Sequence, residues 1–335
     1  MAQDPSPQSA TVATYGMFVR LYITPGLGAK RLDKLSVRDV QTWLNKTRKT
    51  CQCCAQSKDA GRQVPRCCAI GKCCGQLPSD WTVRSAWTVL RSALGNAVHD
   101  ELLARNVAEL ARLPMPRPRK VKPWSVEEAR RFLESARDGA DPLYAAYVLM
   151  LVLGLRRGEL LGLKWEDVDL EAAELHIGWQ LQRVAGQLLR RETKTTASDA
   201  VLPLPGICVN ALLEWAGRQS GWRQSAGSAW HDEAFVISTR HGLPTEPRNL
   251  HRDFKKRCTK AGVPVISVHT TRKTCASLLV ALEVHPRVAM QILRHSQIAV
   301  TMNVYSEVSS AATREALRRL GERLEFGPRD DREKD

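Results

Sequence analysis

Three charged residues follow an apolar run in the middle of the chain. The run ends in GLRRGELLGL at residues 154–163, which places Arg156 three positions before Glu159. Residues three apart on a helix share a face, so the carboxylate can orient the guanidinium group toward an anionic ligand. The alternative is an ordinary surface ion pair at a helix end.

Basic side chains recur in two later segments. In VHTTRKTC, His269 and Arg272 lie three apart at the start of an apolar segment. If that segment is a helix, its N-terminus favours phosphate, and the two side chains share a face there. Lys194 lies in ETKTTASD, at the end of a predicted strand, where a lysine taken alone is usually solvent-facing.

The last segment with reactive side chains is residues 292–308, ILRHSQIAVTMNVYSEV. It contains His295 and, ten residues later, Tyr305. Tyr144 and Tyr147 lie in an apolar run and are expected in the core, whereas the polar neighbours of Tyr305 make packing a weaker explanation for it. A phenol beside several cations can act as a nucleophile toward phosphate.

Taken in order, these fragments resemble the catalytic domain of the tyrosine recombinase, or phage integrase, family. The motifs are G-L-R-x-G-E at 154–159, K-T-x-x-S at 194–198, H-x-x-R at 269–272, L-x-H at 293–295 and T-x-N-x-Y-S-E at 301–307. Each motif is weak alone, but five in the right order are specific. The resemblance covers residues 124–325 and, more loosely, 11–113. The phrase VRLYITPGLGAKRLDKLSVRDVQTWLNK and a later cysteine-rich insert look like integrases of actinobacterial phages and integrative elements.

The resemblance implies site-specific DNA recombination, the integration and excision of a mobile element. Tyr305 would attack a DNA phosphate, form a 3′-phosphotyrosine and so allow strand exchange. Arg156 and Arg272 would stabilise the charge on the phosphate by bidentate hydrogen bonds, with Glu159 in a supporting role.

The remaining roles concern protons. His295 would donate a hydrogen bond to the same phosphate, and His269 would accept or relay the phenolic proton. Lys194 would protonate the departing 5′-hydroxyl. No metal or nucleotide cofactor is required for this chemistry.

The chain departs from the family pattern in three places. Arg294 stands where relatives usually carry glycine, and Thr271 where many carry leucine. The chain also begins inside the first helix of the family's core-binding domain, which suggests N-terminal truncation. Two other functions therefore stay open: a catalytically impaired DNA-binding relic, and relaxation of supercoils in the manner of a type IB topoisomerase.

The elements that position these residues form a mainly α fold with a small antiparallel β-sheet. A capping box of Ser125 and Glu128 starts the catalytic domain, assigned to residues 124–327, and the run 143–155 predicts a buried helix. The segments ELHIGWQLQRV, LLRRETKT and AVLPLP predict one three-stranded sheet. The resemblance implies the catalytic fold of DNA breaking-rejoining enzymes.

Residues 1–113 predict a small helical domain, which the resemblance identifies as a SAM-like core-binding domain. Ser36 and Asp39 resemble a capping box for a helix ending near Lys46. A second amphipathic helix is predicted from Trp81 to Arg105. Its outer face carries Arg84 and Arg91, which are candidates for DNA contacts.

Residues 114–123, PMPRPRKVKP, predict an extended basic linker between the domains. With the helical domain and the catalytic domain it would complete a two-domain clamp around DNA. A loose tail is expected at residues 328–335. The linker residues expected to contact DNA are Arg117, Arg119, Lys120 and Lys122.

Seven cysteines lie in one insert between the two predicted helices. The insert reads CQCCAQSKDAGRQVPRCCAIGKCC. Its groups C-x-C-C, C-C and C-C offer thiolates for zinc, but their spacing differs from the usual C-x₂-C pairs, so a structural zinc site and a reduced surface loop both remain open. The cysteines are Cys51, Cys53, Cys54, Cys67, Cys68, Cys73 and Cys74.

The composition agrees with a DNA-binding protein, and the resemblance implies the bacterial cytoplasm and nucleoid as its setting. The 335 residues include 50 Lys and Arg against 35 Asp and Glu, a formal charge of +15, which favours a polyanionic partner. We expect neither a secretory signal nor a membrane span. The resemblance implies double-stranded attachment-site DNA and a homotetramer on paired sites, with an accessory DNA-bending or excision factor as a further partner. The helix predicted at 309–324 would be exchanged between protomers.

Overall fold

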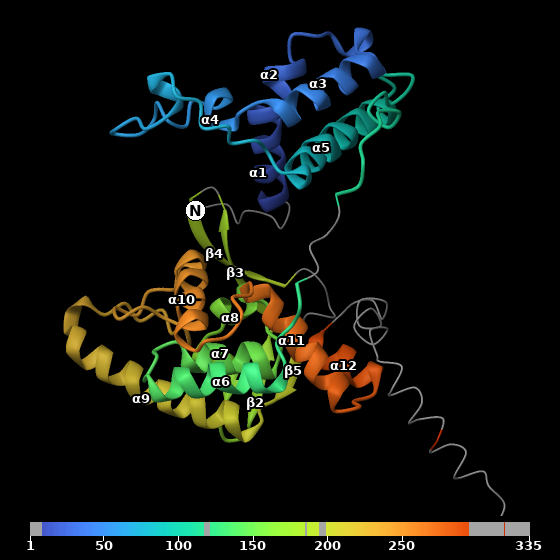
Figure 1. Cartoon of the computed structure of the whole chain (residues 1–335). Coiled ribbons are helices and arrows are strands. Elements are labelled where there is room, and N and C mark those ends of the chain that lie inside the picture. The colour runs from blue at the N-terminus through green and yellow to red at the C-terminus, as the bar shows by residue number, and fades with distance from the viewer. Residues whose placement is uncertain (1–8, 117–120, 185, 194–198, 295–317, 319–335) are drawn as a thin grey trace, which may run out of the picture. The chain divides into compact units, whose positions relative to one another are not determined.

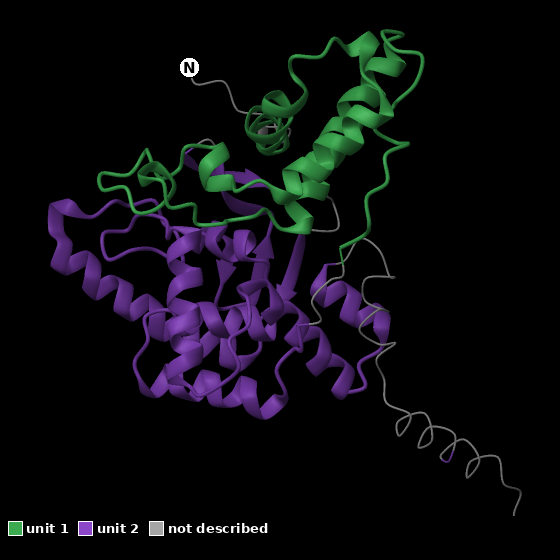
Figure 2. Cartoon of the chain, turned by 45° about the horizontal axis from the view of Figure 1, so that its top comes forward, with its two compact units in different colours: residues 1–120 green, residues 121–335 purple. Residues whose placement is uncertain are grey.

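The computed structural model describes residues 9–116, 121–184, 186–193, 199–294 and 318. The chain divides into two compact units, residues 1–120 and 121–335 (Figure 2). This division falls inside the segment 114–123 that the sequence predicts as a linker. Each unit has a hydrophobic core of its own.

Unit 1 is helical, and its two long helices pack against each other (Figure 1). They are α3 (Val37–Lys49) and α5 (Asp80–His99). Shorter elements precede α3 or lie in the insert between α3 and α5: α1 (Ser9–Phe18), a π-helical turn (Val19–Ile23), α2 (Thr24–Leu27), a 3-10 turn (Leu32–Lys34), α4 (Gln52–Ala55) and a second 3-10 turn (Cys68–Ile70).

Helix α3 begins with the predicted capping box. The Ser36 side chain accepts from the Asp39 backbone N–H, and the Asp39 carboxylate accepts from the backbone N–H of Ser36. The helix continues to Lys49, three residues beyond the predicted end at Lys46. Its apolar face joins the core of unit 1, which comprises Leu27, Val40, Trp43, Leu44, Val83, Ala86, Leu90, Leu94, Val107, Ala108 and Ala111.

Helix α5 buries part of the predicted apolar stripe but ends six residues before the predicted Arg105. Its last residue is His99, and Glu101 then adopts a left-handed conformation with φ +57°. The Leu102 N–H turns back to the Ala97 carbonyl at 2.8 Å, which ends the helix. The chain thereby reverses, and Ala108 packs into the same core as α5.

Unit 2 contains seven helices and five strands among its described residues. The helices are α6 (Val126–Asp138), α7 (Tyr144–Val152), α8 (Arg157–Gly162), α9 (Gly206–Ala226), α10 (Pro247–Lys260), α11 (Val268–Ala281) and α12 (Pro286–Leu293). The strands are β1 (Val168–Asp169), β2 (Glu174–Ile177), β3 (Trp179–Val184), β4 (Gln187–Glu192) and β5 (Ala200–Pro203), with 3-10 turns at Trp165–Asp167 and Gly227–Ala229.

Helix α7 is the centre of unit 2. It lies within the predicted run 143–155, and α6, α8, α9 and α11 pack against it. The capping box of Ser125 and Glu128 starts α6, as predicted. Four aromatic rings form the middle of the core, with ring centroids 4.8–5.9 Å apart: Trp124, Phe132, Tyr147 and Phe254.

The prediction of one three-stranded sheet is wrong in its pairing. Strand β2 pairs antiparallel with β1 and β5, whereas β3 and β4 form a separate two-stranded hairpin. The predicted first strand breaks at Gly178, whose carbonyl accepts the Thr193 N–H at 2.8 Å. A Cβ at this position would lie 3.0 Å from the His176 ring, so a larger residue here would have to displace that side chain.

Within the part of the chain that the structure describes, no helix combines the length and the apolar character required to span a membrane.

Candidate active site

Arg156 lies in the turn between α7 and α8. Gly154, with φ +59°, redirects the chain after α7, and Arg156 then occupies the N-cap position of α8. A Cβ on Gly154 would approach Leu293 of α12 at 2.8 Å and Cys275 of α11 at 3.3 Å. Glycine therefore allows this turn to pack against both helices that carry the rest of the site.

Glu159, in the first turn of α8, is buried and anchors two arginines. Its carboxylate accepts from Arg156 Nη1 at 2.5 Å and from Arg294 Nη2 at 2.7 Å, and also from the Arg156 backbone N–H at 2.8 Å. Its side chain is 3% exposed, so the surface ion pair considered for this motif is excluded. Burial raises the pKa of Glu159, but the charges of Arg294 and Arg156 outweigh burial and lower it overall.

Arg272 lies in the first turns of α11, where Ser267 caps the helix. Its guanidinium group is buried, and Nη1 donates to the Gly154 carbonyl at 2.7 Å. Nη2 has no hydrogen-bond partner among the described residues. Burial, followed by the charges of Arg156 and Arg294, lowers the pKa of Arg272 to about 9, so it remains a cation at neutral pH.

His269, three residues before Arg272, has part of its ring open to solvent. Partial burial and the nearby charges of Arg272 and Lys273 lower its pKa. The imidazole is therefore more often neutral near pH 7 than an ordinary histidine, which leaves a ring nitrogen able to accept a proton.

Arg294, which stands where relatives usually carry glycine, has a specific position in the structure. It caps α12 in a left-handed conformation with φ +51°, a conformation that glycine adopts without strain. Its side chain is 1% exposed and points to Glu159, while its carbonyl accepts from Arg156 Nη2 at 3.1 Å. The only sequence signal was the replacement of the family's usual glycine.

An open pocket of about 560 Å³ adjoins this cluster. Its lining combines the start of α8, strand β3, the start of α10 and the N-terminus of α11, and it includes Arg157, Arg183, His251 and His269. Burial and nearby positive charges lower the pKa of both histidines. Arg183 is paired with Glu246 at 2.7 Å.

The structure thus brings together Arg156, Glu159, His269 and Arg272 from segments more than 100 residues apart. Lys194, His295 and Tyr305 lie outside the described residues, as do Arg117, Arg119 and Lys120 of the predicted linker and, except for residue 318, the predicted helix 309–324.

The other predicted DNA-binding residues are described. Lys122 is exposed in unit 2. In unit 1, Arg84 and Arg91 lie over the Trp87 ring at 5.5 and 5.6 Å, and Arg91 also pairs with Glu109 at 3.1 Å. Among the described residues, the groups of side chains able to hold a metal both lie in the cysteine insert.

The electrostatics of the site favour an anion. The positive charges of Arg156, Arg272 and Arg294 repel one another at a largely buried site. Glu159 offsets only one of these three charges. A phosphodiester would supply the missing negative charge and accept hydrogen bonds from the planar guanidinium groups. The arrangement is suited to stabilising charge on a reacting phosphate.

Comparisons with known proteins agree with this chemistry. The family model described as "Phage integrase family" matches residues 124–311, more than half of the chain. A "Tyrosine recombinase XerC-like" of Caldanaerobacter subterraneus subsp. tengcongensis is 28% identical over 70% of this chain and 64% of its own length. An "Integrase" of Streptomyces ambofaciens is 28% identical over 85% of this chain and 68% of its own length.

The fold is also similar to a solved structure. The integrase of the transposon Tn1549, in complex with transposon right-end DNA, superimposes with a TM-score of 0.69 and 18% identity, over 96% of this chain and 95% of that one. The chain belongs to the phage integrase family, and its class is that of the tyrosine recombinases.

Proposed function

We propose that the chain recombines DNA at specific sites, cleaving and rejoining strands through a 3′-phosphotyrosine on Tyr305. The observation that carries the proposal is the buried cluster around Glu159, in which arginine charge exceeds carboxylate charge. Arg272 supports it further, because one of its buried nitrogens has no hydrogen-bond partner among the described residues. Leaving a buried donor unbonded costs free energy, so a bound phosphate would stabilise the site.

The proposed cleavage step is a transesterification. The Tyr305 oxygen forms a bond to phosphorus as the bond to the 5′-oxygen breaks, and Arg156 and Arg272 stabilise the charge that accumulates on the phosphate. His269 takes the phenolic proton, Lys194 supplies a proton to the 5′-oxygen, and His295 donates a hydrogen bond to the phosphate. A 5′-hydroxyl from another strand reverses the step, so no external energy source is needed.

The proposed partner is double-stranded attachment-site DNA, and the proposed assembly is a homotetramer. The Tn1549 integrase, similar in fold, is described in complex with DNA. Exchange between two duplexes requires four strand cleavages, and each protomer supplies one Tyr305, so four protomers complete the reaction. An accessory DNA-bending or excision factor is part of the same proposal, with the bacterial cytoplasm as its setting.

Trapping the covalent intermediate tests this proposal. Wild-type protein is incubated with nicked half-site DNA from the attachment site of its own element, so that the short released strand diffuses away and the adduct accumulates. Mass spectrometry should place the modification on Tyr305. Tyr305→Phe should bind the same DNA with nearly unchanged affinity and form no adduct.

Tyr147→Phe is the matched control for Tyr305→Phe. The Tyr147 hydroxyl is buried in the core and has no partner among the described residues, so its removal should leave cleavage unchanged. An adduct formed by Tyr305→Phe would contradict the proposal. Specific DNA binding by the wild type with no adduct would contradict it as well.

A further inference from the structure

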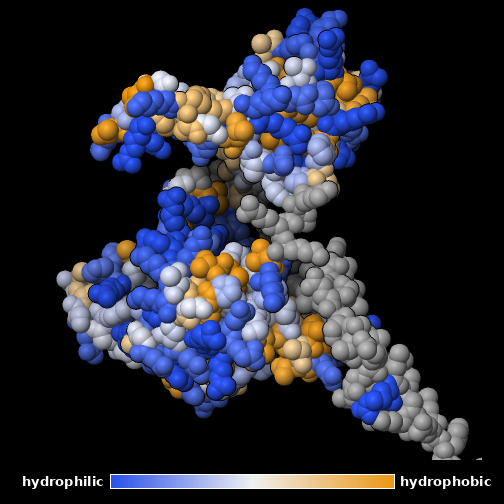
Figure 3. Space-filling view, in the orientation of Figure 1, coloured by the Kyte–Doolittle hydropathy of each residue, from blue (hydrophilic) through white to orange (hydrophobic). Residues whose placement is uncertain are grey.

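The cysteine insert of unit 1 is ordered without a hydrophobic core of its own. Its large aliphatic side chains face solvent: Val64 is 68% exposed and Ile70 is 53% exposed. Figure 3 shows apolar residues at the surface of this part of unit 1. Loops of this length without much regular structure are uncommon in compact domains, and short segments that lack a core are commonly held by disulfides or metals.

The seven cysteine sulfurs of the insert converge, although the residues span 24 positions. The Sγ–Sγ distances are 3.6 Å for Cys54 and Cys73, 3.7 Å for Cys68 and Cys74, and 3.8 Å for Cys53 and Cys67. Cys51 lies 3.9 Å from both Cys68 and Cys74. Disulfide sulfurs are only about 2 Å apart, so these thiols are unbonded.

These separations match a tetrahedral zinc site. Zinc binds thiolate at about 2.3 Å, which makes the edge of a ZnS₄ tetrahedron about 3.8 Å. The sulfurs form two groups of four, and within each group all of them lie within 4.8 Å of one another. The first group is Cys51, Cys54, Cys68 and Cys73, and the second is Cys53, Cys67, Cys68 and Cys74.

Cys68 belongs to both groups. Seven thiolates can complete two tetrahedra when one of them bridges, so the insert has the number of sulfurs that two bridged metal ions need. The convergence of all seven explains why the spacing departs from the C-x₂-C pairs of a single-metal site: the neighbours Cys53 and Cys54, and likewise Cys73 and Cys74, serve different groups.

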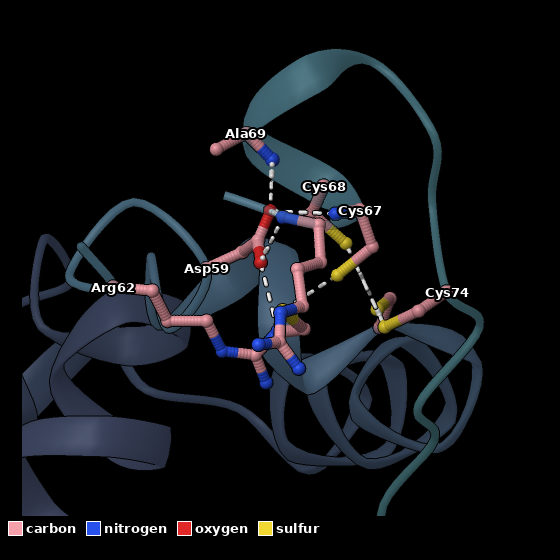
Figure 4. Close-up of polar contacts among 9 residues, drawn as sticks. Asp59, Arg62, Cys67, Cys68, Ala69 and Cys74 are labelled. Carbon is pink, nitrogen blue, oxygen red and sulfur yellow. Dashed lines mark hydrogen bonds and ion pairs between the residues drawn. The ribbon is translucent and has the colours of Figure 1, made fainter. Parts of the chain in front are cut away.

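Asp59 organises the loop that presents Cys67 and Cys68. Its carboxylate is 1% exposed and accepts from the backbone N–H groups of Arg66, Cys67 and Ala69 at 2.8–3.1 Å. Arg62 Nη1 donates to it at 2.9 Å. Figure 4 shows these bonds closing around Asp59, with the sulfurs of Cys67, Cys68 and Cys74 gathered on the adjacent side.

The charge of the insert suits such a cluster. Two zinc ions and seven thiolates carry three negative charges in total. The basic side chains of the insert are Lys58, Arg62, Arg66 and Lys72, and with Asp59 they carry three positive charges. The cluster would therefore be neutralised by the segment that surrounds it, which lowers the cost of gathering thiolates in one place.

We propose that residues 51–74 hold two zinc ions in a seven-thiolate cluster bridged by Cys68, and that this cluster folds the insert. The seven sulfurs supply the ligand set, and Asp59 sets the backbone that presents two of them. The inference does not rest on the proposed recombination chemistry.

Metal analysis of the full-length chain, purified without chelator, tests the stoichiometry. Two equivalents of zinc per chain are expected. One equivalent or less would overturn the two-metal cluster, and so would iron with acid-labile sulfide. Thiol titration of the folded protein should show the seven insert cysteines protected until a chelator is added, and disulfides at these positions would also overturn the proposal.

Cobalt substitution tests the bridge by a signature that does not depend on activity. The first equivalent of Co²⁺ should give the intense visible bands of tetrahedral thiolate coordination and a paramagnetic resonance signal. The second equivalent should increase the absorption but weaken that signal, because a shared thiolate couples the two ions antiferromagnetically. A signal that doubles with the second equivalent would exclude the bridge.

Single substitutions distinguish shared from unshared ligands. Cys73→Ser removes a ligand from the first group and should retain about one zinc, since the second group stays complete. Cys68→Ser leaves both groups incomplete and should retain less than one. Cys208→Ala, a buried cysteine of α9, is the control and should keep two. Equal retention by Cys68→Ser and Cys73→Ser would contradict the bridging role.

Discussion

Glu159 joins two arginines that approach it from distant parts of the chain. Arg156 precedes it by three residues, whereas Arg294 follows it by 135 residues. Removing one partner of a buried ion pair costs more than the pair itself contributes, because the remaining charge is left uncompensated. Glu159 therefore holds the α7–α8 turn and the end of α12 in the positions that the arginine cluster requires.

Replacing Glu159 by glutamine should destabilise unit 2 by about 3 kcal/mol, since the buried guanidinium group of Arg294 loses its counter-charge and the partly exposed Arg156 loses an ion-pair partner. The effect should depend on pH. The folded-state pKa of Glu159 lies below its unfolded value of 4.5, so its contribution is present above that pH and is lost as the pH falls toward the folded pKa. Urea denaturation from pH 7 to pH 3 should show the wild type and Glu159→Gln converging at low pH. A constant difference would contradict this role.

Arg272→Lys should lower the rate of DNA cleavage on the order of 10²-fold or more. A single ammonium group cannot both donate to the Gly154 carbonyl and bind a phosphate through a planar pair of nitrogens. Single-turnover cleavage of nicked half-site DNA measures the loss, and a binding assay should show little change. Arg287→Lys, at an exposed position on α12, should leave the rate unchanged. Equal rates for the wild type and Arg272→Lys would contradict the assignment.

The sequence allowed one half of this ion-pair cluster to be predicted and not the other. Arg156 and Glu159 are local partners, so their spacing alone suggested the pair. The contact of Arg294 depends on a left-handed residue at the end of α12 and on the packing of α12 against α11, neither of which is encoded in local spacing.

At the scale of elements, the sequence predicted correctly those features that depend only on residues close together in the chain. Ser36 with Asp39 and Ser125 with Glu128 each form the capping box that the sequence predicted. The strand pairing was wrong because β2 and β3 are contiguous in sequence and join different sheets at Gly178. The cysteine spacing did not predict that the sulfurs converge, since they meet through the fold of the insert and not along one turn.

Gly162 sets the approach of α8 to β3. A Cβ at this position would lie 2.8 Å from the Gln180 Cα and 2.9 Å from the Leu181 backbone nitrogen. Backbone atoms cannot move aside as a flexible side chain can. Gly162→Ala should therefore push α8 from the hairpin, destabilise unit 2 by roughly 1–3 kcal/mol and slow cleavage through displacement of Arg156.

Gly217→Ala provides the matched control for Gly162→Ala. Gly217 lies within α9, and a Cβ there would meet nothing within 4 Å. Alanine should stabilise this helix by about 0.5–1 kcal/mol because it restricts the unfolded chain. Thermal or urea denaturation of the two variants should show shifts of opposite sign. Two shifts of the same sign would show that close packing at Gly162 is not the cause.

At the scale of the whole molecule, the chain forms two compact units. One contains the candidate active site, and the other is helical and contains the cysteine insert. The arginine cluster is built entirely within residues 121–335, whereas the cysteine cluster is built entirely within residues 1–120. The net charge, in contrast, is a property of the whole chain. The formal charge of +15 was the first sequence indication of a polyanionic partner, and it is a property of composition that no single element displays.

This charge predicts a steep salt dependence of DNA affinity. Each phosphate neutralised by a basic side chain releases condensed counterions, so the affinity should fall by about 10³-fold or more between 50 and 200 mM salt if at least six phosphates are contacted. Lys122→Ala, at an exposed position outside the arginine cluster, should reduce the slope of log affinity against log salt by about one. Arg130→Ala is the control, since Arg130 already pairs with Glu134 at 2.9 Å and should leave the slope unchanged. Fluorescence anisotropy with labelled duplex DNA measures the slopes, and an affinity that hardly varied with salt would show that the excess positive charge does not face DNA.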